Sequence, residues 1–136
     1  MAGQWLALRA HGVSSRWIAR TAVAMSAGTA VAAAATGAGT DVPDLALSGL
    51  IAGAAVGVAQ GGLLGGRAGA IWTAATATSW TLDWIATASI GVDVEHGYHV
   101  FGSAGAILVM VLTGLVLRHV LAGEARREAV GVAVLG

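Results

Sequence analysis

The sequence of 136 residues contains no cysteine. This absence excludes disulfide bonds, thiolate metal sites and cysteine nucleophiles. Lysine is missing as well, and all seven basic residues counted as lysine or arginine are arginines. Schiff-base chemistry and the lysine of a phosphate-binding loop therefore have no residue to carry them.

Charged residues are also scarce, at 10% of the chain, against about 25% in a typical soluble domain. Residues 21–40, 45–66 and 97–117 contain no acid or arginine, and residues 68–92 contain only Asp83. Hydrophobic residues make up 57% of the chain, and its mean hydropathy is +0.79. A helix needs roughly 20 apolar residues to cross about 30 Å of hydrocarbon. The sequence therefore predicts an all-α integral membrane protein, built as a four-helix bundle.

The whole chain, residues 1–136, is expected to form a single transmembrane domain. The expected helices cover about residues 17–38, 45–66, 70–91 and 97–118, followed by a cytoplasmic tail at 119–136. Pro43 is expected to break the chain before the second helix, with Asp44 as the cap of that helix. Residues 4–13 fit either a short amphipathic helix on the membrane surface or an unstructured leader.

The arginines predict the orientation of this bundle. All of them fall on one side of a four-span arrangement, and loops rich in arginine stay cytoplasmic. They are Arg9, Arg16, Arg20, Arg67, Arg118, Arg126 and Arg127. We therefore expect a multi-pass protein of the cytoplasmic (inner) membrane with both termini in the cytoplasm. Trp17 and Trp72, at the cytoplasmic helix ends, are expected to lie in the aromatic belt.

Glycine recurs at every fourth position across the second predicted helix and the turn after it. These residues are Gly49, Gly53, Gly57, Gly61, Gly65 and Gly69. Glycine weakens a helix by about 1 kcal/mol relative to alanine, but small residues let membrane helices approach closely. We predict a glycine zipper that packs this helix inside the bundle; a homo-oligomer interface and a pore lining are the alternatives. Leu63 and Leu64 are expected to face lipid.

The two predicted hairpins resemble copies of one another. One alignment places Trp17 on Trp72, Thr21 on Thr76 and Ser48 on Ser103. Both copies have the same orientation, so the repeat is parallel and its axis runs along the membrane normal.

Three segments of the chain carry a distinctive pattern of tryptophan, glycine and small residues: "WTAATATSWTLDW", "GVDVEHGYHVFGSAGA" and "LTGLVLR". These segments resemble a group of small bacterial four-helix integral membrane proteins of uncharacterised activity. The group repeats hairpins of tryptophan and small residues, and its "G-x-D-x-x-x-G-Y-x-V-F-G" signature matches residues 91–102. Asp83 departs from the pattern, which has a small residue there. The resemblance implies the fold and the compartment and no activity.

Asp83 is the only acid in the predicted spans. A carboxylate in hydrocarbon costs several kcal/mol and is normally paired or functional. Thr76, Ser79 and Thr87 lie on the same side of a helical wheel as Asp83, and Trp80 and Trp84 flank it. Two interpretations remain open. Asp83 is either a neutral acid that is hydrogen-bonded inside the bundle, or part of a proton or cation relay along this stripe of side chains. A small ligand, if there is one, would bind along the same stripe.

Acids and histidines cluster in the connection before the last predicted helix, at Asp93, Glu95, His96 and His99. Such side chains bind divalent metals, but the spacing matches no zinc signature. A polar loop is the favoured interpretation and a metal site the alternative. No cofactor is expected.

The sequence contains no catalytic motif, and we interpret the chain as a non-enzymatic membrane protein of structural or accessory type. It is a candidate subunit of a larger membrane assembly. The alternative is a small oligomeric transporter or channel that uses Asp83 as its relay. The expected partners are the lipid bilayer and either further copies of the chain or a larger membrane complex. Nucleic acid is not expected, because the net charge is +0 and there is no basic face to bind it.

Overall fold

A computed structural model describes residue 9, residues 14–89, and residues 109, 111–119, 122–123 and 126 of the chain. Within these residues all regular secondary structure is helical, so the predicted all-α class is confirmed. The principal helices are α2 (Arg16–Thr36), α3 (Val42–Leu64) and α4 (Gly66–Ser89). Residues 111–119 are helical too and are called here the C-terminal helical segment.

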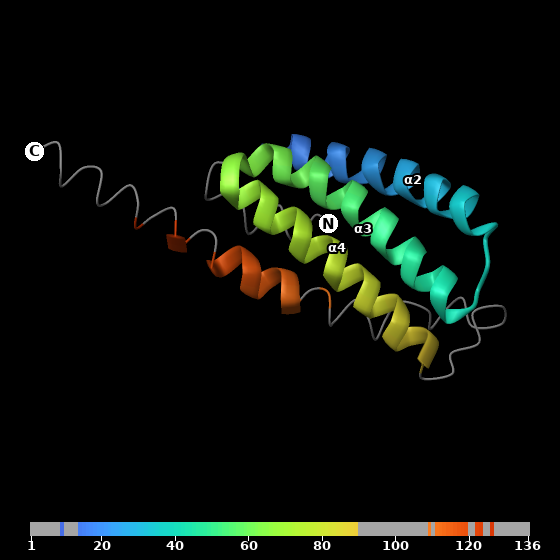
Figure 1. Ribbon diagram of the computed structural model, residues 1–136. Coiled ribbons are helices and arrows are strands. Elements are labelled where there is room, and N and C mark those ends of the chain that lie inside the picture. The colour runs from blue at the N-terminus through green and yellow to red at the C-terminus, as the bar shows by residue number, and fades with distance from the viewer. Residues whose placement is uncertain are drawn as a thin grey trace, which may run out of the picture.

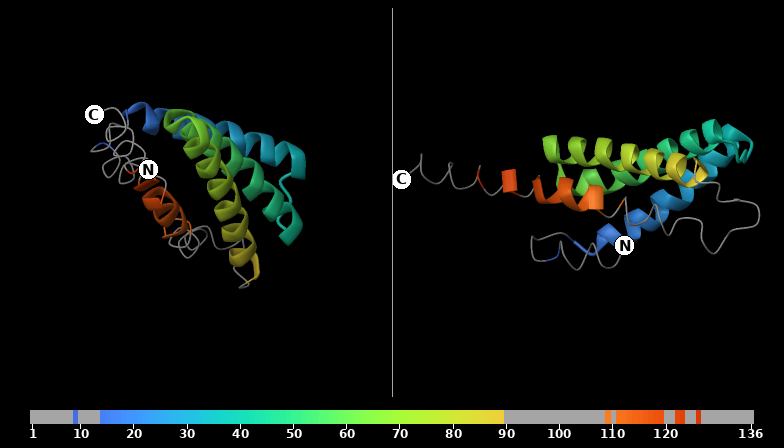
Figure 2. Two further views of the ribbon diagram at one scale, coloured as in Figure 1. Left: turned by 60° about the vertical axis from the view of Figure 1, so that its left-hand side comes forward. Right: turned by 90° about the horizontal axis from the view of Figure 1, so that it is seen from below.

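Helix α3 lies between α2 and α4 and runs antiparallel to both (Figure 1). It is in close backbone contact with each neighbour, whereas α2 and α4 make no such contact with one another. The views of Figure 2 show the same order, with the C-terminal helical segment as a further rod beside the three helices. The short connections on both sides of α3 explain the antiparallel arrangement.

The connection from α2 to α3 differs from its prediction. Helix α2 ends at Gly37, which takes the left-handed conformation with φ of +62°. The side chain of Asp41 accepts a hydrogen bond of 2.9 Å from the backbone N–H of Asp44, so Asp41 caps α3 and the predicted cap at Asp44 is wrong. Pro43 lies in the first turn, where its missing N–H has no partner to lose. The helix therefore starts before the expected residue 45.

The face of α3 that meets α4 is made of glycine. A Cβ atom added to Gly49 would lie 2.8 Å from the carbonyl oxygen of Trp80, and one added to Gly57 would lie 2.9 Å from the Cα of Thr73. At Gly61 the corresponding distance, to the carbonyl oxygen of Gly69, is 2.5 Å. Real Cβ atoms essentially never come so close to backbone atoms. The two backbones therefore touch along a surface that no larger residue can occupy.

The run of six glycines does not continue along one helix. Gly65 has φ of +72° and Gly66 has φ of +45°, so the chain reverses there. Positive φ values are readily available only to glycine, which makes a connection of one residue between α3 and α4 possible. Gly69 consequently belongs to α4 and faces Gly61 from the opposite side. Helix α4 starts at Gly66 rather than near residue 70.

A second close approach, between α2 and α3, was not predicted. A Cβ atom on Gly28 would lie 2.8 Å from the Cβ of Ala55 and 3.1 Å from the Cα of Ala52. Helix α3 thus presents small residues to both of its neighbours. This packing brings the polar side chains of all three helices within hydrogen-bonding reach.

Replacement of Gly57 by alanine tests the contact between α3 and α4. We expect Gly57→Ala to destabilise the detergent-solubilised protein by about 1–3 kcal/mol, because the new methyl group overpacks against the backbone of Thr73. Thermal unfolding followed by circular dichroism measures the change.

The matched control is Gly114→Ala in the C-terminal helical segment, where an added Cβ meets nothing within 4 Å. Its melting temperature should stay the same or rise, because alanine favours a helix by about 1 kcal/mol over glycine. Equal stability of the Gly57→Ala protein and the wild type would contradict the close approach.

Candidate functional site

Two tryptophans face one another between α2 and α4. The ring centroids of Trp17 and Trp72 are 5.7 Å apart with an interplanar angle of 55°, and their exposed fractions are 0% and 1%. Trp17 therefore links α2 to α4 through side chains although the two backbones are not in contact. The predicted place of both residues in an aromatic belt is wrong, because each is covered by protein.

Aliphatic side chains from α3 and the C-terminal helical segment surround this pair. They are Leu63, Leu64, Val116 and Leu117. The prediction that Leu63 and Leu64 face lipid is therefore wrong, since both are partly buried against the indoles. The reason is that both leucines lie in the last turn of α3, which packs against the tryptophan pair.

Gln60 joins all three helices from this position on α3. Its Nε2 donates a hydrogen bond of 2.8 Å to the hydroxyl oxygen of Thr21 on α2. Its Oε1 accepts one of 2.9 Å from the indole N–H of Trp72 on α4. The hydroxyl of Thr21 in turn donates to the carbonyl oxygen of Trp17 over 2.6 Å. We call these four residues the Gln60 cluster.

The Gln60 cluster is closed to water. Gln60 is 2% exposed and Thr21 is 1% exposed, so neither side chain has solvent as an alternative partner. A buried polar group without a partner costs about 1–3 kcal/mol, more than a satisfied bond contributes. The amide thus fixes the relative positions of α2, α3 and α4, because displacement of any one helix would leave a buried polar group unpaired.

The two tryptophans that the predicted repeat aligns are only partly equivalent. Thr76 donates to the carbonyl oxygen of Trp72 over 2.8 Å, as Thr21 does to that of Trp17. The indole N–H of Trp72 is satisfied by Gln60. In the described part of the chain, however, the buried indole N–H of Trp17 has no hydrogen-bond partner. The environments of the two indoles therefore differ at this one donor.

The stripe around Asp83 runs along α4 away from the Gln60 cluster. Thr76, Ser79 and Thr87 are all buried, and Asp83 is partly buried. The side chains of Asp83 and Thr87 are hydrogen-bonded. Among the described residues, nothing bonds to the buried Oδ1 atom of Asp83. The structure thus brings the predicted polar stripe together on a covered face, with one carboxyl oxygen unpaired.

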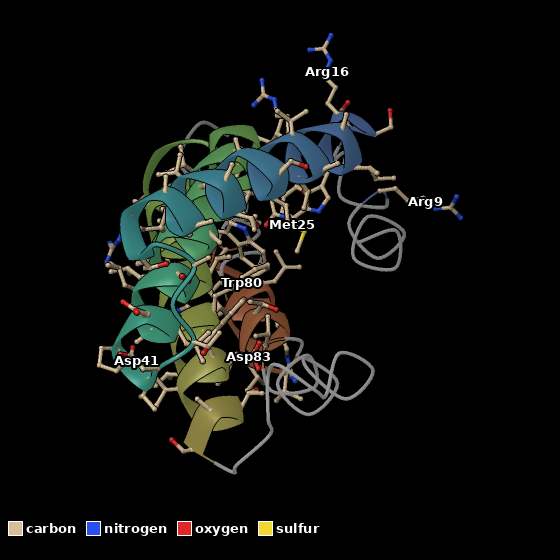
Figure 3. All side chains as sticks on the ribbon, turned by 90° about the vertical axis from the view of Figure 1, so that its right-hand side faces the viewer. Arg9, Arg16, Met25, Asp41, Trp80 and Asp83 are labelled. Carbon is tan, nitrogen blue, oxygen red and sulfur yellow. The ribbon has the colours of Figure 1, made fainter. Side chains whose placement is uncertain are left out.

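The tryptophans that flank Asp83 do not share one environment. Trp80 lies against α3, where its backbone oxygen and its Cβ meet the positions of Gly49 and Gly53. Figure 3 shows Trp80 and Asp83 projecting from α4, with Met25 of α2 on the same side of the bundle. Trp84 is half-buried. Trp80 therefore serves the packing of α4 on α3.

The predicted metal candidates Asp93, Glu95, His96 and His99 lie outside the described residues. Within the described ranges, no three histidine or acidic side chains are grouped so that they could hold a metal ion.

Comparison of the chain with protein-family models, curated proteins and solved structures gave no match.

A polar residue in an apolar helix, Gln60 is predicted by the sequence to bond across helices. The structure confirms this prediction, and replacement of Gln60 tests the cluster. We expect Gln60→Leu, which keeps the approximate volume of the side chain, to lower the free energy of unfolding by about 1–3 kcal/mol, because the indole N–H of Trp72 loses its acceptor. Unfolding in detergent followed by tryptophan fluorescence measures the loss.

A double-mutant cycle with Trp72→Phe serves as the control. Phenylalanine has no N–H, so Gln60→Leu should cost less in the Trp72→Phe background than in the wild type. Equal costs in both backgrounds would mean that the bond between Gln60 and Trp72 adds no stability.

Proposed function

We propose that the chain is a non-enzymatic, multi-pass protein of the cytoplasmic membrane with a structural or accessory role in a larger membrane assembly. The membrane location is supported by an inverted distribution of side chains. Val23, Val31 and Val58 are 70%, 58% and 63% exposed, whereas Thr21 and Gln60 are almost completely covered. Water would favour the reverse arrangement, and lipid favours this one.

The lengths of the helices agree with this proposal. Helices α2, α3 and α4 contain 21, 23 and 24 residues, and about 20 are needed to span the hydrocarbon. Two of them, α2 and α3, are apolar enough to cross a membrane. Only 17% of the apolar stretch of α2 and 33% of that of α3 is buried, whereas a core helix of a soluble protein is mostly buried. In this proposal α4 and a fourth helix around residues 97–118 complete the bundle.

The structural role is supported by polar side chains that form hydrogen bonds between helices. The amide of Gln60 and the hydroxyl of Thr21 hold helices to one another. The hydroxyl of Thr73 likewise reaches from α4 to the carbonyl oxygen of Gly57 on α3 over 3.0 Å. Together with the glycine face, which we propose acts as a zipper, these bonds give a rigid body. In the same proposal the two hairpins are a parallel repeat, with the Trp17–Trp72 pair at its centre.

Single cysteines in this cysteine-free chain test the membrane location and the orientation. Thr40 lies between α2 and α3, Ser14 precedes α2, and both residues are exposed. We expect a membrane-impermeant maleimide to label Thr40→Cys in intact spheroplasts and Ser14→Cys only after lysis, because the arginine-rich side stays in the cytoplasm.

Extraction of the same membranes with alkaline carbonate is the companion measurement, and both variants should remain in the pellet. Release into the supernatant would rule out an integral membrane protein. Labelling of Ser14→Cys in intact spheroplasts would reverse the proposed orientation.

The second candidate function is a small oligomeric transporter or channel. The observation that favours it is the buried Oδ1 atom of Asp83, which has no hydrogen-bond partner among the described residues. The buried hydroxyls of Thr76, Ser79 and Thr87 add oxygen ligands along the same stripe. A proton or a small cation is the chemical class that such a stripe would carry.

The substitution Asp83→Asn separates the two functions. Asparagine keeps the shape and an acceptor oxygen but cannot release a proton. In the structural role, we expect Asp83→Asn to melt at or above the wild-type temperature, and vesicles that hold the wild-type protein to leak protons no faster than empty vesicles. A pH-sensitive dye inside the vesicles measures the leak.

The control is Asp44→Asn, which removes an acid from the loop-facing first turn of α3. A proton flux in wild-type vesicles that survives Asp44→Asn and disappears with Asp83→Asn would overturn the structural role in favour of the transporter.

A further inference from the structure

One end of the bundle gathers several exposed arginines, and we call it the arginine end. Helices α2 and α4 both begin where α3 finishes (Figure 1), and this brings Arg16 and Arg20 to the same end as Arg67. Arg118 closes the C-terminal helical segment beside Val116 and Leu117, which pack on the tryptophan pair. All four of these arginines are exposed.

The described acids do not neutralise this charge. Asp41 caps α3 and Asp44 lies in its first turn, both at the opposite end of the bundle, and Asp83 lies within α4. Figure 3 shows Asp41 well separated from Arg9 and Arg16. Within the described ranges, Arg16, Arg20, Arg67 and Arg118 form no ion pair. Their counter-charge must come from outside this part of the chain.

Two of these arginines lie where a positive charge does not stabilise the helix that carries it. Arg16 and Arg67 lie in the first turns of α2 and α4, which contain no acid. The start of a helix carries partial positive charge, so acids stabilise it and basic residues do not. A bound anion would offset both the arginine charges and the helix ends.

The surroundings of these arginines match the border between headgroups and acyl chains. Ile18 follows Arg16 along α2, and Ile71 lies one turn beyond Arg67 on α4; each is 37% exposed. The guanidinium of Arg20 extends over the last turn of α3, where its Nη1 lies 3.6 Å from the place of a Cβ on Gly62. Charge and exposed apolar surface therefore adjoin one another on neighbouring helices.

We propose that the arginine end binds the phosphodiester headgroups of anionic phospholipids in the leaflet that it faces. The planar guanidinium presents two parallel N–H donors to a phosphate, and the isoleucines beside it contact the first carbons of the acyl chains. This inference rests on the membrane location proposed above. It adds a preference for one class of lipid, which membrane insertion alone does not require.

Native mass spectrometry of the detergent-solubilised protein tests the proposal with dioctanoyl phosphatidylglycerol as the anionic lipid and dioctanoyl phosphatidylcholine as the zwitterionic comparison. We expect the wild type to prefer phosphatidylglycerol and to lose the preference in high salt. Each replacement in the set Arg16→Gln, Arg20→Gln and Arg67→Gln should lower the affinity for phosphatidylglycerol about fivefold. The affinity for phosphatidylcholine should not change.

Replacement of the same three arginines by lysine is the matched control. It keeps the charge, so most of the preference for phosphatidylglycerol should remain. Asp44→Asn, at the opposite end, should leave both affinities unchanged. Because the salt dependence needs only the wild type, the test holds even if a glutamine variant fails to fold.

Equal affinity of the wild type for the two lipids would overturn the proposal, and so would glutamine variants that keep the preference. Displacement of phosphatidylglycerol by an equal concentration of inorganic phosphate would show a site for free anions and would overturn the assignment to lipid. Carbonate extraction separates this outcome from failure of the membrane location: a chain that stays in the pellet but lacks the lipid preference refutes only the present inference.

Discussion

The contact between the backbones of α3 and α4 is the constraint on which the other features of the bundle depend. At Gly49, Gly53, Gly57 and Gly61, α3 contributes no side chain to the contact with α4. Such a close approach brings many atoms of the two helices into van der Waals contact, and these small attractions add up to a large one. The contact also sets the distance at which Thr73 donates its hydroxyl hydrogen to the carbonyl oxygen of Gly57.

The Gln60 cluster depends on this arrangement. One primary amide can bond to two helices only if a donor or acceptor atom of each helix lies within about 3 Å of its nitrogen or oxygen. The small residues on both faces of α3 bring the partner atoms of α2 and α4 this close. The result is an interior whose polar atoms act as ties between helices. Asp83 differs, because one of its oxygens is buried without a partner among the described residues. Asp83 is therefore the position in α4 that distinguishes the two proposed roles, because only transport requires its carboxyl group to bind and release a proton or a cation.

Much of the helical architecture followed from the sequence. The long uncharged runs predicted the helices, whereas the contact between the aligned Trp17 and Trp72 was not predicted. The ends of the helices were less well predicted. Asp41 rather than Asp44 caps α3, because a proline is tolerated in the first turn and does not have to precede the helix. Gly65 ends α3 because consecutive glycines reverse the chain there at positive φ, which a pattern of spacing does not reveal.

The sequence by itself determined the all-helical class, the polar stripe of α4 and the segregation of arginines to alternate connections. These features follow from local composition and from the rise and period of a helix. Only the tertiary structure decided which residues meet across helices. It buried Trp17 and Trp72 and partly buried Leu63, where the sequence suggested contact with the membrane, and it gave Gln60 its two partners. In the proposed membrane setting the physical reason is that an apolar side chain has nearly the same free energy against lipid as against another helix. Hydrophobicity therefore cannot distinguish the two environments, and the choice is made by the shape and the hydrogen bonds of the packed helices.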